Sequence, residues 1–397
     1  KALTIGNKDD FDEQLLTNIS NIGISHLFVI SGLHINIIYN CLIWLFSKLH
    51  LKQNIKTISS LIILLLYYLI SGLMISVLRV ILSIILKAIN DKYEYGLSNK
   101  DLFSLNVIII LIINPFYLFQ YSFILSYLIS GSIIICNHLL KSTNKNKFFN
   151  FLISTFKVST LATFITLPIV AKINYHINFL SCLYNLFYIP LVTYIFLPFS
   201  FLLIIIPRLE IFFYYFYQGF SYVTNLLSKI KIFMINFPNV HFIIILVYYV
   251  IFYLLLIKIE KKQIPIKLLV FFILLLFIWN QNNIFNIYDE VYFLDLPKGE
   301  ATFIRKSHNK ANILIDTGEN GYDDIILFLK SLGIKRLDMV IISHSDSDHN
   351  GMLDEIISEF KIKKIYYNQY DQVTKLKINN NIKHIPLKCN DCISLYD

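Results

Sequence analysis

Long apolar stretches follow one another from Ile24 to about Trp279 and dominate the chain. A helix needs about 20 residues to cross the hydrocarbon core of a bilayer, and most of these stretches meet or approach that length. They lie near residues 24–46, 58–89, 102–119, 120–140, 151–171, 179–206, 211–228, 241–257 and 266–279. Because the second stretch can be two short helices broken around Ser71 and Gly72, the pattern predicts about eight to ten crossings. We therefore expect a polytopic α-helical membrane bundle over residues 24–280.

The residues before this bundle have a different pattern. Apolar side chains recur at helical spacing between residues 9 and 22, and aspartates stand at the leading end, which suits a helix N-terminus. Such a stripe fits a helix that lies along a membrane surface, and it fits equally a helix that packs on protein. We expect an amphipathic interfacial segment over residues 1–23, with the packing alternative left open.

The pattern changes again at about residue 288. Short runs at 290–295, 312–316 and 338–342 are typical of strands bounded by Gly, Asn and Asp, and helical stretches follow at 323–331 and 351–360. This alternation predicts a water-exposed domain of strands and helices over residues 288–397.

Composition agrees with a membrane protein. Hydrophobic residues make up 56% of the chain and charged residues only 15%, which excludes both an ordinary soluble protein and a disordered one. On a membrane protein a net charge of +9 often reflects only loop lysines near anionic lipid, so by itself it does not indicate a nucleic-acid partner. Lysines flank most apolar segments without favouring alternate loops, so they do not give the orientation.

Polar residues inside apolar spans usually face protein or a wet cavity. Three groups stand out: His26, Ser31, Gly32 and His34; Arg79; and the hydroxyl ladders that include Ser122, Ser126 and Thr163. Each has a structural alternative, since hydroxyl ladders can be helix-packing faces, a histidine can bond a backbone carbonyl, and Arg79 can reach the interface. A buried cation costs at least ~2.5 kcal/mol, so Arg79 most needs a partner or water. Together these residues indicate a polar route through the bundle.

The same positions carry a family resemblance. Gly23-Ile24-Ser25-His26-Leu27 leading into Ile30-Ser31-Gly32-Leu33-His34 resembles the signature of the ComEC family of DNA-uptake channels. Later landmarks follow in the family's order: Ser76 to Arg79 (Ser-x-x-Arg), Asn114-Pro115, Ser122 to Ser126, Leu167-Pro168, Asn185 and Ile189-Pro190.

This resemblance implies a multi-pass channel in a bacterial inner membrane that passes single-stranded DNA to the cytoplasm. The implied partners are DNA, membrane lipids and other DNA-uptake proteins, namely a DNA receptor and an ATPase, with oligomerisation left open. Family members usually begin with an OB-like domain and further helices before the point that corresponds to Gly6. Either this chain is a piece of a longer protein, or this homologue is short.

The predicted soluble domain contains a metal motif. In Ser343-His344-Ser345-Asp346-Ser347-Asp348-His349, two imidazoles and two carboxylates stand within six residues, directly after an apolar strand. These groups can converge on one or two divalent ions, and a carboxylate facing bound water can accept its proton. The alternative is a solvated acidic turn that happens to hold two histidines.

The motif resembles the His-x-Asp-x-Asp-His variant of the metallo-β-lactamase fold found in the ComEC C-terminal domain. Carried over by position, His344 and Asp346 bind one ion and Asp348 and His349 the second, with Asp348 as the catalytic residue. An Asp in place of a His favours harder cations, so Mn²⁺ or Mg²⁺ competes with Zn²⁺. Asp316 and Asp295 are expected to hold the ligand side chains in place without binding the metal themselves.

Two departures from the family pattern bear on activity. Pro297 and Lys298 replace a Gly and a Gln in the turn after Asp295, and the fold's later ligands come from a second half that this chain lacks. We therefore expect a partial αβ/βα metallo-β-lactamase-like domain, incomplete at its C-terminus. The predicted function is a DNA-translocating channel with an appended nuclease-like or phosphodiesterase-like domain. The alternative is a membrane-anchored, metal-dependent hydrolase whose helices do not conduct.

Overall fold

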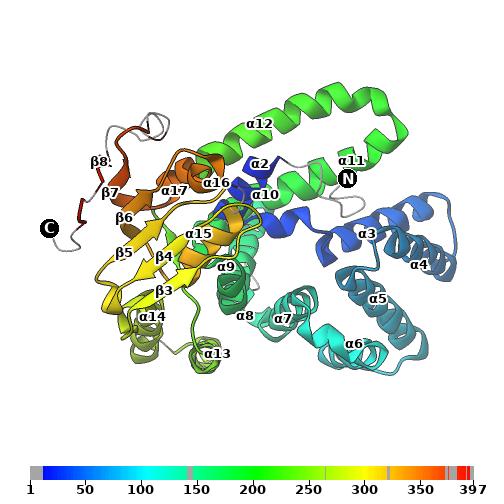
Figure 1. Cartoon of the computed structure of the whole chain (residues 1–397). Helices are drawn as coiled ribbons and strands as arrows, with labels where there is room; N and C mark the ends of the chain where they lie inside the picture. Colours follow the sequence, from blue (N-terminus) through cyan, green and yellow to red (C-terminus); the bar gives the residue numbers. More distant parts are fainter. Residues whose placement is uncertain are drawn as a thin grey trace. The chain divides into compact units, whose positions relative to one another are not determined.

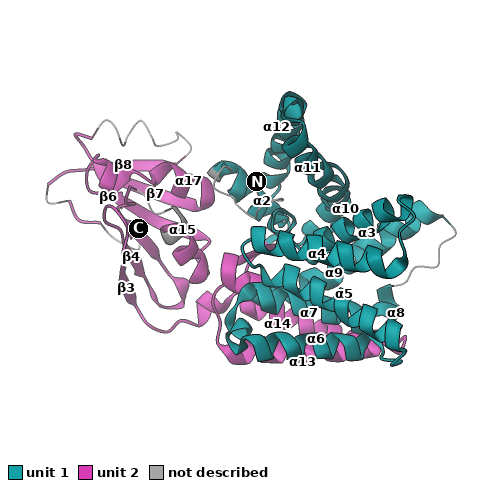
Figure 2. Ribbon diagram, turned by 90° about the vertical axis from the view of Figure 1, so that its right-hand side faces the viewer, with its two compact units in different colours: residues 1–169, 178–234 teal, residues 170–177, 235–397 magenta. Residues whose placement is uncertain are grey.

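A computed structural model describes residues 12–140, 146–263, 265–319, 322–371, 374, 382–389 and 391–393. The chain divides into two compact units (Figure 2). The first comprises residues 1–169 and 178–234, and the second comprises residues 170–177 and 235–397.

The first unit is helical, with its elements coloured blue to green in Figure 1. Its elements are α2 (Glu13–Ile22), η1 (Ser25–Phe28), α3 (Gly32–Lys48), α4 (Gln53–Ile70), α5 (Ile75–Tyr93), α6 (Asn99–Ile113), η2 (Pro115–Phe119), α7 (Tyr121–Ile135), α8 (Asn137–Leu140), α9 (Lys147–Asn174), α10 (Ser181–Leu191), η3 (Val192–Phe196), α11 (Leu197–Ile205), η4 (Pro207–Leu209) and α12 (Glu210–Ser228). Helix α9 ends in the second unit, and the short strands β1 (His176–Asn178) and β2 (Met234–Asn236) form a two-stranded sheet.

Several predicted spans are interrupted. Residues 24–46 form the short η1, an extended bridge and then α3, because Ser31 adopts an extended conformation as the N-cap residue. The break predicted around Ser71 and Gly72 is present, and both Gly72 and Leu73 have positive φ there. A positive φ ends a helix at little cost only where the residue is glycine. The chain therefore divides its apolar sequence into shorter helices than the hydrophobic pattern predicts.

Four helices in the described residues are long and apolar enough to cross a membrane, against about eight to ten crossings expected from the sequence. They are 53–70, 147–174, 181–205 and 242–260, and the helices at 121–135 and 266–280 are apolar but shorter. The breaks leave several helices below 18 residues, and α5 and α12, each of 19 residues, are too polar or charged to count among the four.

Helix α2 shows how the predicted amphipathic stripe is used. Leu15, Ile19 and Ile22 are buried in a cluster with Tyr188 of α10 and Phe220 of α12. The apolar face of α2 thus packs on protein, as in the alternative that the sequence left open. Residues 1–11 lie outside the described part, and the interfacial position of segment 1–23 stays a prediction.

The second unit contains a helical hairpin followed by a mixed sheet. Its elements after β2 are α13 (Phe242–Glu260), α14 (Ile266–Asn280), η5 (Asn282–Phe285), β3 (Glu290–Phe293), β4 (Thr302–Arg305), η6 (Ser307–Asn309), β5 (Asn312–Ile315), α15 (Tyr322–Ser331), β6 (Arg336–Ile342), α16 (Ser347–Asn350), α17 (Leu353–Glu359), β7 (Lys361–Asn368) and β8 (Lys383–Leu387). The six strands lie in the order β3-β4-β5-β6-β7-β8. Strand β4 pairs antiparallel with both β3 and β5, and β5 to β8 pair in parallel.

The sheet has one well-covered face. Its core includes Leu314, Val340 and Ile365 from the strands and Leu329 and Ile356 from α15 and α17. The other face groups strand residues with Ile393. The predicted strands correspond to β3, β5 and β6, and the predicted helical stretches to α15 and to α16 with α17. This domain is consistent with the expected metallo-β-lactamase-like fold.

Candidate metal centre and membrane polar network

The metal motif follows strand β6, and Asp316 follows β5, its parallel neighbour. Ile315 and Ile341 pair in register, so the two strands end side by side and bring both turns to the same edge of the sheet. The short helix α16 then carries Asp348 and His349. Strand pairing alone therefore places Asp316 beside a motif about 30 residues further along the chain.

Asp316 organises the turn through three hydrogen bonds. Its carboxylate accepts from the backbone N–H and the hydroxyl of Ser343, both at 2.8 Å, and lies 2.9 Å from Nδ1 of His349. Its own φ is +57°, a conformation that Asp tolerates better than most residues. Because Nδ1 of His349 is engaged, Nε2 remains for a metal, which is how a supporting carboxylate fixes a ligating imidazole.

The same hydrogen bond changes the titration of His349. The carboxylate of Asp316 raises the pKa of His349, chiefly through the hydrogen bond; desolvation opposes this, and charge attraction from Asp316 adds a smaller increase. Thr317 secures the backbone at this point, because its N–H and its hydroxyl donate to the carbonyl of His349 at 2.7 and 3.1 Å.

Three of the four predicted ligands come together. His344, Asp348 and His349 each offer a ligand atom, and these atoms lie within 4.8 Å of one another. The two imidazole centroids are 3.9 Å apart. The Asp346 carboxylate lies 3.5 Å from Nε2 of His344, with its side chain 73% exposed and outside this group of three. Two imidazoles and one carboxylate are a donor set that fits a divalent ion, so the residues present match the group that the motif implies.

The loop before β4 packs directly on the metal turn. The N–H of Glu300 donates to the carbonyl of Asp348 at 3.1 Å, and Gly299 has φ +93° with a Cβ position that would overlap that carbonyl. Lys298 forms an ion pair with Glu319 that raises the pKa of the Lys298 amine. Asp295 is exposed and makes no hydrogen bond within the described residues, so only Asp316 of the two expected supporting carboxylates contacts the metal turn.

A second polar group lies inside the first unit, around Arg79 of α5. Its Nε donates to the hydroxyl of Ser126 on α7 at 2.8 Å, and its guanidinium lies 5.9 Å from the centroid of the Tyr127 ring. Gly32 at the start of α3 faces the same group, because a Cβ there would lie 2.5 Å from Nη2 of Arg79. Among the described residues no carboxylate forms an ion pair with Arg79.

Further hydrogen bonds extend this network to α6 and to the bridge before α3. The Asn106 side chain donates to the carbonyl of Arg79 and to the Ser83 hydroxyl, both at 2.9 Å, and accepts from the Tyr127 hydroxyl. The Ser76 hydroxyl donates to the carbonyl of Ile30 at 2.8 Å.

His34 and Ser31 close the start of α3 in the same region. The N–H of Ser31 donates to Nδ1 of His34 at 3.3 Å, and His34 is fully buried. The structure therefore connects four helices, α3, α5, α6 and α7, through residues that include Ser31, Gly32, Arg79 and Ser126 from the predicted route.

The other predicted route residues lie elsewhere in the first unit. His26 in η1 and Ser122 at the start of α7 are exposed. Thr163 lies 3.4 Å from the Cys182 sulfur, and Asn185 is buried in α10, where Pro190 precedes the π-helical turn η3. Their hydrogen bonds within the described residues do not reach Arg79.

Sequence reasoning missed several of the residues that support these groups. Asn106 and Tyr127 in the membrane network, and Ser343 and Thr317 at the metal turn, were not predicted. Asn106 carried a usable signal, because it is a lone amide in an apolar run, whereas the roles of Ser343 and Thr317 depend on strand pairing.

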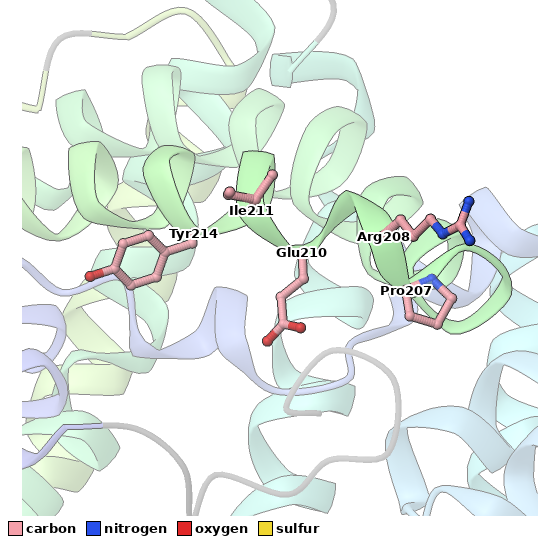
Figure 3. Close-up of a pocket in the computed structure, with 5 residues that line it drawn as sticks. All are labelled: Pro207, Arg208, Glu210, Ile211 and Tyr214. Atoms are coloured by element: carbon pink, nitrogen blue, oxygen red, sulfur yellow. The ribbon is translucent and has the colours of Figure 1, made fainter.

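An open hollow at η4, lined by Pro207, Arg208, Glu210, Ile211 and Tyr214, contains none of the predicted site residues (Figure 3).

Comparison with known proteins identifies both parts of the chain. The model of the family described as Competence protein matches residues 3–262, and the model of the metallo-beta-lactamase superfamily matches residues 296–377. The chain therefore belongs to the competence protein family and carries a metallo-β-lactamase-like domain at its C-terminal side. With its long apolar helices, it is a membrane protein of a DNA-uptake family.

Individual relatives agree. The chain is 26% identical to ComE operon protein 3 of Bacillus subtilis over 397 residues, covering 92% of this chain and 50% of that protein. It is 28% identical over 229 residues to the uncharacterized protein MG316 homolog of Mycoplasma pneumoniae, covering 57% of this chain and 58% of that protein. The chain thus spans about half the length of the curated relatives it matches. The predicted family resemblance is confirmed, and the superfamily implies a divalent metal.

Proposed function

We propose that this chain forms part of a multi-pass channel in a bacterial inner membrane that passes single-stranded DNA to the cytoplasm. The observation that carries the proposal is the Arg79 network, a cation within an apolar helical unit whose partners in the described part of the chain are all neutral. Membership of the competence protein family supports DNA as the cargo. Membrane lipids, a DNA receptor and an ATPase are the expected partners.

The physical reason lies in the charge balance around Arg79. A guanidinium inside an apolar bundle is costly unless a partner or water accompanies it. Ser126 and Tyr127 provide a hydroxyl acceptor and a ring face, but neither neutralises the charge. The remaining N–H donors suit phosphate oxygens, which arginine binds through paired hydrogen bonds. A passing nucleic-acid backbone would therefore supply the missing negative charge.

A transformation assay tests this role. In a transformable bacterium that relies on this protein, Arg79→Leu is expected to abolish uptake of labelled single strands, and Arg79→Lys to retain part of it. Arg208→Leu, at the exposed η4 turn, is the matched control and should leave uptake unchanged. Normal uptake by a well-expressed Arg79→Leu variant contradicts the proposed path.

For the soluble domain we propose hydrolysis of phosphodiester bonds. His344, Asp348 and His349 would hold the divalent ion, with Asp346 beside them and Asp316 fixing the orientation of His349. A bound Mn²⁺, Mg²⁺ or Zn²⁺ supplies Lewis acidity and lowers the pKa of a bound water. Asp348, whose side chain is 46% exposed, would accept a proton at a carboxylate oxygen that does not bind the ion.

The convergence of these three ligands also favours a second candidate, a membrane-anchored hydrolase whose helices do not conduct. The purified chain should then cleave an oligonucleotide only when Mn²⁺, Mg²⁺ or Zn²⁺ is added. Both candidates predict lost cleavage in Asp348→Ala, so Arg79→Leu separates them: lost uptake with intact cleavage favours the channel, whereas unchanged uptake favours the anchored hydrolase.

A further inference from the structure

The soluble domain is fastened to the ends of two apolar helices within the second unit. The Trp279 indole at the end of α14 donates to the carbonyl of Pro238, just before α13, at 2.8 Å. On the domain side, the N–H of Asn239 donates to the carbonyl of Ser331 at 2.8 Å, and the Asn283 amide donates to the carbonyl of Gly333 at 2.9 Å. These contacts seat the domain directly on the α13–α14 hairpin.

The end of the domain that contacts the α13–α14 hairpin is basic. The parallel strands β6 and β7 begin with Arg336 and Lys361, which pair in register, and β8 begins with Lys383, which pairs with Lys364 three residues further along β7. Together with exposed cations nearby they form what we call the basic rim: Lys310, Lys335, Arg336, Lys361, Lys363 and Lys383. Lys335 connects the rim to the hairpin, because its amine donates to the Asn280 side chain at 2.8 Å.

Few acids neutralise the rim. Asp338 lies 3.1 Å from Arg336 and 2.7 Å from Lys363, and no other ion pair to a rim residue is present in the described part of the chain. Asp289, Glu290 and Glu359 also lie at this end and are paired with Lys306, Arg305 and Lys330, whereas Glu300, Asp316, Asp346 and Asp348 gather around the metal turn at the other end of the strands. The seven residues of β6 separate the two ends by about 20 Å. The domain is thus electrically polarised along its strands.

Exposed apolar side chains accompany the rim. Directly after α14, Phe285, Ile287 and Tyr288 are 63%, 61% and 67% exposed. Their segment is held at the same end of the sheet, because the N–H of His308 donates to the carbonyl of Asn286 at 2.6 Å. Aromatic and aliphatic side chains next to cations are typical of surfaces that enter the headgroup region of a bilayer.

We propose that the basic rim and the apolar segment 284–288 rest on anionic lipid headgroups of the bilayer that the α13–α14 hairpin enters, with the metal turn directed away from the lipid. Lipid fits better than nucleic acid, because the rim continues from the ends of apolar helices and because headgroups would bury the exposed apolar segment. The acidic end is repelled by the same surface, which fixes the orientation of the domain. The proposal holds whether or not the chain conducts DNA.

Lipid nanodiscs holding the full chain test the contact. A fluorophore is attached at Lys383→Cys in a background with the five native cysteines changed to Ser, and headgroup-linked nitroxide lipids act as the quencher. In discs with phosphatidylglycerol we expect at least a twofold stronger quenching than in pure phosphatidylcholine, and the difference should fall with added salt. The same label at Ser347→Cys, beside the metal turn, should show little quenching in either disc.

Charge reversal provides the decisive comparison. Lys361→Glu with Lys310→Glu should remove the phosphatidylglycerol-dependent quenching at position 383, whereas the matched control Lys388→Glu, beyond the opposite end of β8, should not. Quenching that is equal in both discs, or unaffected by the rim reversal, overturns the proposal. If the reversal instead weakens binding of a single-stranded oligonucleotide and leaves the quenching intact, the rim is a nucleic-acid surface and the lipid assignment is wrong.

Discussion

The Arg79 network and the metal turn are two polar groups with opposite excess charge. The Arg79 guanidinium contacts a hydroxyl and a ring of α7, and an amide of α6 donates to the Arg79 carbonyl; all three groups are neutral, so an excess positive charge remains among the described residues. At the metal turn, carboxylates from separate segments surround two imidazoles, so the excess is negative. The first group is prepared for an anion and the second for a cation, although both are held by hydrogen bonds between distant parts of the sequence.

The two groups also differ in how a single residue controls the position of a binding side chain. Gly32 leaves room for the Arg79 guanidinium in a crowded helical unit, so its role there is to keep space free. Asp316 instead fills the space behind His349 and fixes the ring. One group therefore depends on a missing side chain and the other on a particular carboxylate. Substitutions at these two positions should fail in different ways.

The largest expected effect is in the membrane network. Gly32→Val places carbon atoms where the Arg79 guanidinium lies, so we expect DNA uptake to fall at least about 100-fold, because a displaced guanidinium loses its defined position. Transformation frequency in cells with matched protein levels measures the effect. Gly219→Ala in α12 meets no atom within 4 Å and is the control. Uptake that survives Gly32→Val would mean that the network does not line the path.

At the metal turn, Asp316→Asn keeps the size of the side chain and removes its charge. Because the carboxylate orients His349, metal affinity should fall about 10- to 100-fold. Calorimetric titration of the purified chain with Mn²⁺ and Zn²⁺ gives the value. Asp295→Asn is the matched comparison: both carboxylates were predicted to support the metal ligands, but only Asp316 contacts the turn, so the Asp295 variant should bind the metal normally. Equal losses in both variants would restore the role predicted for Asp295.

Low pH should weaken metal binding at the turn. Asp316 raises the pKa of His349, so the proton competes with the metal at a higher pH than it would on an ordinary imidazole. Affinity is therefore expected to decrease as the pH falls from 8 toward 6, by about tenfold per unit below the pKa of His349 for one competing proton. In Asp316→Asn the onset should move to lower pH. An unchanged onset would exclude this hydrogen bond as the cause.

The smallest effect is expected from Tyr127→Phe. The change removes the hydroxyl that donates to Asn106 but keeps the ring beside Arg79. One lost hydrogen bond corresponds to about 1 kcal/mol, so uptake should decrease only a few-fold. Tyr127→Leu, which also removes the ring, should be clearly worse in the same assay. If the two variants are equal, the ring contact contributes nothing.

The sequence predicted the identities of the chemical groups better than their connections. The metal motif, Asp316 and Arg79 were found because unusual residue types stood in unusual places. Their partners were not, because Tyr127 resembles any aromatic residue in an apolar helix and Ser343 gains its role only when β5 and β6 pair.

Element boundaries show the same limit. The apolar run at 24–46 predicted one helix, but the chain forms η1 and then α3, with Ser31 as the N-cap of α3. Hydrophobicity alone does not show where a helix is capped. In contrast, the strand runs at 290–295, 312–316 and 338–342 correspond to β3, β5 and β6, because short apolar runs flanked by turn residues have few other solutions.

Hydrogen bonds join Trp279 to Pro238 and Asn283 to Gly333. Because of them, the α13–α14 hairpin and the six-stranded sheet are expected to move together. If the hairpin leans by about 10°, the far end of β6, about 20 Å away, moves by about 3.5 Å. A change in bilayer thickness or tension would thereby shift His344 and His349 by more than the length of a hydrogen bond, without any rearrangement inside the domain.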